Sequence, residues 1–138
     1  MNRESISNPQ QFRQLRDAFF QLHKALVDSE RVEYERVMGT IDSPAEFVRL
    51  LMTDSWFSWL RPHSQLIVSM DEAFGKNGSL TIAQLGDLSN RCRELLTVSD
   101  GDKGAAGHYF DALQRDPDVI LAHAEVMRQL GVRLEKEE

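Results

Sequence analysis

The chain has 138 residues, of which 41% are hydrophobic and 28% charged, with a formal net charge of −6. This balance excludes a disordered tail and a collagen-like fibre, and the length suits one domain spanning 1–138. No apolar run approaches the roughly 18 residues that a membrane helix needs, and the scattered basic residues form no cationic stripe for nucleic acid. We therefore expect a soluble globular protein with no membrane and no nucleic-acid partner.

The segment 10–38 carries apolar residues at helical spacing in two neighbouring lines. These residues are Phe12, Leu15, Phe19, Leu22 and Leu26 in one line and Phe20, Val27 and Tyr34 in the other. A face this broad predicts one long helix packed into a core. Opposite charges four residues apart, such as Arg13 and Asp17, occupy the other face, and Gly39 is a suitable left-handed stop.

The next helix begins with a specific capping pattern. Ser43 can accept from the amide of Glu46, whose side chain can reach back, and Pro44 stands where no backbone donor is lost. Within the long apolar run that follows, Pro62 removes one donor and crowds the preceding turn. We therefore expect this second helix to be kinked or broken near Arg61 and Pro62.

Three later segments also carry signals for the start or body of a helix. Thr81 and Gln84 form a second capping-box pattern, and a shorter helix containing Tyr109 follows the polar loop 99–104. Asp116 and Pro117 then open a last helix. No alternating strand pattern is present.

Long helices joined by short polar loops favour antiparallel neighbours. The fold class predicted is therefore all-α, an up-and-down bundle of four to five helices. We expect the ends, 1–9 and 133–138, to fray.

The histidines invite a metal hypothesis, because helical bundles can hold metals with Glu-x-x-His pairs on facing helices. Neither that motif nor His-x-x-x-His occurs in this sequence. We therefore predict no metal and no cofactor. The single cysteine, Cys92, lies on an apolar stripe and is interpreted as a small core residue. A lone cysteine cannot form an internal disulfide, which favours the cytoplasm.

Two histidines, His63 and His123, fall on apolar stripes of their helices. A histidine in such a place is most simply a core residue whose ring nitrogens find partners. The alternative is a polar pair inside the bundle that binds a ligand or senses pH. The spacing leaves both interpretations open.

The stretch 54–63 is the most unusual in the chain. Its aromatic residues Trp56, Phe57 and Trp59 cover an arc wider than one core face needs, and Arg61 and His63 follow directly. The favoured interpretation is a helix buried on two sides. The others are a self-association surface and the wall of a pocket, with Arg61 and His63 as its polar groups.

The function expected from these features is a non-catalytic helical interaction or regulatory module. The surplus aromatic residues predict a homodimer, and a further protein partner is possible. The alternative is a bundle that binds a small ligand, metal or cofactor in its interior and acts as an enzyme. No phosphate-binding glycine loop or nucleophile elbow is present, so no catalytic residue is assigned.

Overall fold

The computed structural model describes residues 9–75, 80–97 and 104–137. The elements are α1 (Pro9–Met38), α2 (Pro44–Thr53), the 3-10 helix η1 (Ser55–Leu60), α3 (Arg61–Gly75), α4 (Ile82–Leu95), α5 (Ala105–Arg115) and α6 (Pro117–Glu137). The described part is helical and contains no strand, so the all-α prediction is confirmed. No helix in it is both long and apolar enough to cross a membrane. Most of the loop 99–104, and residues 1–8 and 138 of the two ends, lie outside the described residues.

The described part contains six α-helices, so the expected count of four to five is wrong. The reason lies in the segment interpreted as one kinked helix. It is broken at Asp54, whose backbone is extended and whose carboxylate accepts the amide of Trp56 at 2.8 Å. Pro62 stands in the first turn of α3, where the missing N–H costs no helical hydrogen bond. The proline therefore starts a new helix and does not bend an existing one.

The two capping patterns form to different extents. Ser43 Oγ accepts the amide of Glu46 at 3.1 Å, but the Glu46 carboxylate pairs with Arg49 and does not return to the cap. Thr81 and Gln84 make both bonds of a capping box, at 3.0 and 2.8 Å. Both helix starts are as predicted, although only the second box is complete.

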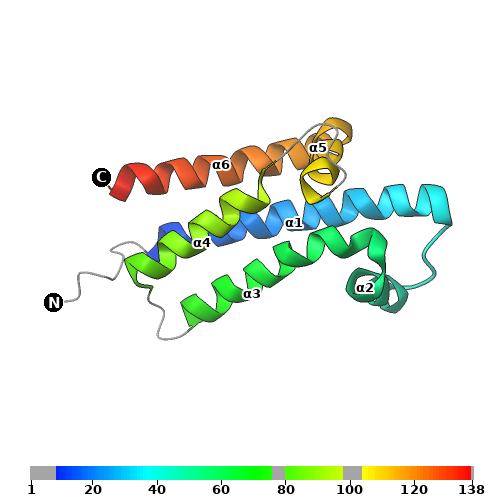
Figure 1. The fold of residues 1–138 in the computed structure, drawn as a ribbon, viewed down its shortest axis with the longest axis horizontal. Helices are drawn as coiled ribbons and strands as arrows, with labels where there is room; N and C mark the ends of the chain where they lie inside the picture. Colours follow the sequence, from blue (N-terminus) through cyan, green and yellow to red (C-terminus); the bar gives the residue numbers. More distant parts are fainter. Residues whose placement is uncertain (1–8, 76–79, 98–103, 138) are drawn as a thin grey trace.

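The central element is α1, and α6 and α3 run antiparallel to it (Figure 1). The most extensive contact is between α1 and α6. Ala18 and Ala25 of α1 and Ala122 of α6 line the surface hollows along this contact. Small side chains let two helix axes approach closely, which explains the extent of the contact. At the end of α1, Gly39 has a φ of +101° and donates its amide to Glu35, the expected stop.

Three polar cross-links join α1 to the η1–α3 segment. They are Arg16–Asp71 at 2.7 Å, His23–Ser64 at 3.0 Å and Glu30–Trp56 at 3.0 Å. Their α1 members are spaced by seven residues and so lie on one face of the helix. Between the cross-links, buried side chains such as Phe19 and Leu66 form the core.

Candidate functional site

The aromatic residues of η1 are distributed between the core and the surface. Phe57 is fully buried and Trp59 is 7% exposed, whereas Trp56 is half-buried. Phe57 packs between Tyr34 and Phe47, with ring centroids 5.4 and 5.9 Å away. Two of the three aromatic residues therefore belong to the core of the monomer, and only Trp56 borders solvent.

Arg61 joins the start of α3 to the end of α2. Its guanidinium donates to the carbonyl oxygens of Leu51 at 3.1 Å and Asp54 at 2.7 Å. The last carbonyls of a helix lack partners within the helix and need a donor of this kind. In this structure Arg61 therefore completes the chain reversal between α2 and η1.

His63 is the centre of a cluster of rings in the interior. It is 1% exposed and lies between four other rings. The centroid distances are 5.7 Å to Phe19, 6.3 Å to His23, 6.0 Å to Trp59 and 6.4 Å to Tyr109. The other two histidines adjoin the same cluster: His108 stacks on Trp59 at 5.6 Å, and the Tyr109 hydroxyl forms a hydrogen bond with His123 Nδ1 at 2.5 Å. All four histidines of the chain are thus brought together from α1, α3, α5 and α6.

His63 and His123 do not contact each other directly but share Tyr109 as a neighbour. The Tyr109 ring meets His63 edge to face, and its hydroxyl binds His123. Burial raises the pKa of Tyr109 and lowers the pKa of His123. Both groups are therefore uncharged at neutral pH and share one hydrogen bond.

Several polar nitrogens of the cluster have no hydrogen-bond partner among the described residues. They are Nδ1 and Nε2 of His63, Nδ1 of His23 and Nε1 of Trp59. Burying a polar group without a partner costs free energy, and burying a charge costs more. Burial, with a smaller contribution from His23, accordingly lowers the pKa of His63 to about 4. Burial also lowers the pKa of His23.

A groove of about 510 Å³ opens beside this cluster, between α1, η1 and α5. Its walls carry two aromatic rings, four carboxylates and two basic groups, and its rim carries the exposed Met38. The chemically distinctive lining residues are Trp56, Tyr34, Glu30, Glu33, Asp54, Asp111, His108 and Arg115. Trp56 and Tyr34 meet edge to face at 5.4 Å. His108 belongs both to the groove and, through Trp59, to the histidine cluster.

Glu30 holds the floor of the groove in place. Its side chain is 7% exposed and accepts the indole N–H of Trp56 at 3.0 Å and Arg115 at 2.6 Å. Arg115 also donates to Ser29 at 3.0 Å. Both carboxylate oxygens of Glu30 are therefore occupied, and Trp56 is fixed with one edge inward.

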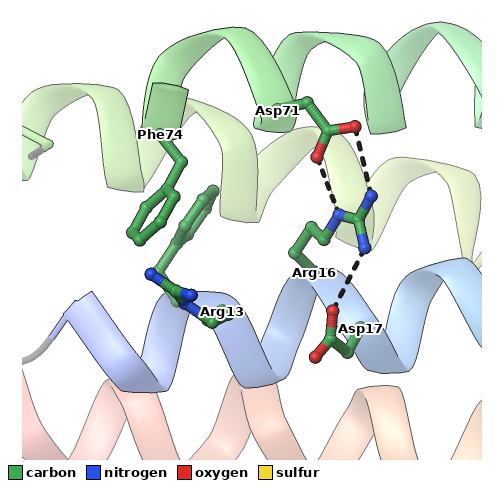
Figure 2. Close-up of a pocket in the computed structure, with 6 residues that line it drawn as sticks. Arg13, Arg16, Asp17, Asp71 and Phe74 are labelled. Carbon is green, nitrogen blue, oxygen red and sulfur yellow. Dashed lines mark hydrogen bonds and ion pairs between the residues drawn. The ribbon is translucent and has the colours of Figure 1, made fainter. Parts of the chain in front are cut away.

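A second pocket, of about 380 Å³, lies between the start of α1 and the end of α3 (Figure 2). Arg16 makes two hydrogen bonds to Asp71 and one to Asp17, and Arg13 lies 4.4 Å from the ring centre of Phe74. The predicted Arg13–Asp17 pair is thus replaced by Arg16–Asp17. The Asp71 hydrogen bond is the main cause of a raised pKa at Arg16. Because its cations are already engaged, this pocket is less suited to a ligand than the groove.

No known protein family, curated protein or solved structure matches the chain. The site is therefore interpreted from its own residues. In the described part of the chain, no three His, Cys, Asp or Glu side chains are grouped so as to hold a metal ion.

Sequence reasoning missed Glu30, Arg115 and His23 as members of this region. A signal for Glu30 exists, because it stands four residues after Leu26 and so continues the buried line of α1. The sequence carries no comparable signal for Arg115, because which helix faces Glu30 depends on the packing of α5 against α1.

Proposed function

We propose that this protein is a non-catalytic interaction module whose groove binds a cationic side chain of a partner protein. The observation that carries the proposal is the position of Trp56. It is the one aromatic residue of η1 left at the surface, and it is held rigidly beside acidic groups. A cation is attracted both by the face of an aromatic ring and by nearby carboxylates.

The charge of the groove favours this partner over an anionic one. Arg115 neutralises Glu30, which leaves Glu33, Asp54 and Asp111 facing one basic group, His108. Glu33 forms an ion pair with Arg36 at 2.6 Å, whereas Asp111 has no ion-pair partner among the described residues. The volume suits one or two side chains. An arginine or lysine anchor on a partner segment therefore fits best.

The test is fluorescence anisotropy with a labelled arginine-rich nonapeptide at low ionic strength, compared with its glutamate counterpart. We expect the basic peptide to bind, and Asp111→Asn to weaken binding several-fold, because removing a facing charge lowers complementarity. Asp87→Asn is the matched control, since Asp87 is an exposed carboxylate on α4, outside the groove. Equal loss in both variants would mean that only net charge matters, and the groove proposal would fail.

A second candidate is the homodimer, which we also propose but with a different surface. Phe57 and Trp59 are already buried in the monomer, so they are not free to form an interface. Support comes instead from α6, where Ile120 and Met127, seven residues apart on one stripe of the helix, are 49 and 48% exposed and the adjacent Leu121 is 69% exposed. Apolar side chains gathered on one face are typical of an interface.

Light scattering after size-exclusion chromatography tests the dimer. We expect a dimer at micromolar concentrations that Leu121→Glu converts to monomer, because the same patch meets itself across a two-fold axis. Val68→Glu, a matched change at an exposed position on α3, should leave the dimer intact. A monomeric wild type would exclude this candidate.

Finally, we propose a cytoplasmic location, supported by the single cysteine of the sequence, Cys92, which cannot form an internal disulfide.

The interior ligand site suggested by the sequence has less support. The rings of Phe19, Trp59 and Tyr109 pack around His63 and occupy the space that a ligand would need. The unpartnered nitrogens of the cluster therefore call for a different explanation.

A further inference from the structure

The rings of His23 and His63 lie against each other between α1 and α3. Their centroids are 6.3 Å apart and their planes are inclined by 19°. Ser64, next to His63, hydrogen-bonds His23 at 3.0 Å. The pair therefore occupies the middle one of the three cross-links that join α1 to the η1–α3 segment.

Among the residues that the structure describes, none supplies a counter-ion to a protonated ring at this position. Along the cross-linked face, the neighbouring charges are Arg16 with Asp71 and Asp17 on one side and Glu30 with Arg115 on the other, and each of these carboxylates is engaged by its arginine. The groups that adjoin the cluster from the remaining elements are Tyr109 and His108 of α5 and His123 of α6. None of these three is an anion at neutral or acidic pH, because burial keeps the Tyr109 phenol protonated by raising its pKa.

We propose that the stacked pair His23–His63 is an acid-sensitive lock that holds α1 against η1–α3 at neutral pH and opens when either ring takes up a proton. A buried imidazolium without an anion is costly, and it can be relieved only if the ring reaches water. Water can reach the pair if η1–α3 moves away from α1. This inference does not depend on what the groove binds.

The direction of the pH effect follows from burial. The pKa of His63 is lowered from the ordinary 6.5 to about 4. The unfolded or opened state therefore binds protons more readily. The contribution of the neutral ring to the stability of the closed state is fully present above pH 6.5 and is lost as the pH drops toward 4. For His63 alone, the equilibrium constant for closing falls roughly 30-fold between pH 7.5 and pH 5.0. The pKa of His23 is also lowered, so His23 changes the equilibrium constant for closing in the same direction.

The first experiment follows wild-type protein by NMR and hydrogen exchange. The ring signals of His63 should show a neutral imidazole at pH 6, in contrast to an ordinary histidine. After correction for intrinsic exchange rates, amides of η1 and α3 should lose protection at pH 5.0, while those of α6, packed on α1, keep it. If His63 titrates with a pKa near 6.5 in the folded protein, the lock is excluded. Loss of protection in all helices together would show global unfolding and would overturn the proposal that η1–α3 opens locally.

The second experiment measures urea unfolding at pH 7.5 and pH 5.0. His63→Leu removes the titrating ring at similar volume. In this variant the acid-induced fall in the equilibrium constant for folding should be smaller by about the same 30-fold. His108→Gln is the matched control, because His108 is an exposed histidine of the same cluster and should leave the fall unchanged. An equal fall in the folding equilibrium constant of wild type and of His63→Leu would refute the proposal. Should His63→Leu fail to fold, the wild-type titration above decides alone.

Discussion

The carboxylate of Glu30 shows how a single buried charge is accommodated in this all-helical fold. It is the one acidic residue buried among those the structure describes, and it is paired with Arg115 from α5 and the indole of Trp56 from η1. A buried charge is tolerated only when its hydrogen-bonding capacity is filled. Glu30 therefore connects three elements through one side chain.

We expect Glu30→Ala to lower the free energy of unfolding by about 2–3 kcal/mol, because breaking a buried pair leaves Arg115 and the Trp56 N–H without their acceptor. Urea unfolding at pH 7.5 measures this change. Glu46→Ala, which breaks the exposed pair with Arg49, is the control and should have a much smaller effect. Similar losses in the two variants would contradict the structural role of Glu30.

The segment that reverses the chain between α2 and α3, from Asp54 through η1, is the least regular part of the structure. Asp54 ends α2 and caps η1, Arg61 covers the last carbonyls of α2, and Pro62 lies in the first turn of α3. Each of these residues ends or begins a helix, and none interrupts one. The 3-10 helix between them turns Phe57 and Trp59 into the core.

Pro62→Ala distinguishes a helix start from a helix kink. At a helix start, proline mainly restricts the unfolded chain, so the substitution should lower the free energy of unfolding by about 0.5–1 kcal/mol. In a continuous helix, alanine would restore a backbone hydrogen bond and stabilise the protein. Pro44→Ala, at the start of α2, should behave as Pro62→Ala does. A stabilising Pro62→Ala, measured in urea, would contradict the observed break.

The whole molecule is built around α1, which contacts α6, α3 and η1. In contrast, α4 packs mainly on α3 (Figure 1). It contributes four fully or nearly buried residues, Leu85, Leu88, Ser89 and Cys92. The thiol of Cys92 is 0% exposed. Its reactivity therefore reports how often α4 separates from the rest of the protein.

We expect Cys92 to react with a thiol reagent at least about 100-fold more slowly in native protein than in urea-denatured protein, because labelling needs an opening event. The absorbance of the released thiolate measures both rates at pH 8. Asp87→Cys, in a Cys92→Ala background, places an exposed thiol on the same helix and should react at once. Fast labelling of native Cys92 would mean that α4 is not stably docked.

The sequence was a good guide to local structure and a poor one to contacts between helices. Gly39, Ser43 and Thr81 act as predicted because caps and stops depend on neighbouring residues only. The break at Asp54 was not predicted, since an aspartate cap on a 3-10 helix resembles ordinary helical sequence, whereas the change from η1 to α3 at Arg61 lies where a break was expected.

The candidate site was predictable only in part. Periodicity placed His63 on a buried face but could not show that His23 would lie against it, because that depends on how α1 and α3 are aligned. The pairing of Trp56 with Glu30 has the same origin. Helical spacing identifies which face of a helix is buried, and only tertiary packing determines what that face meets.

The three cross-links between α1 and η1–α3 also bear on the accuracy of folding. Arg16, His23 and Glu30 recur every seven residues, and each meets a different partner, Asp71, Ser64 or Trp56. Sliding one helix past the other by a single turn would leave all three polar groups facing unsuitable neighbours at once, whereas purely apolar faces would tolerate the slip. Polar residues placed in this way fix the register of paired helices. We infer that these cross-links discriminate against misaligned collapsed states as well as stabilising the native one.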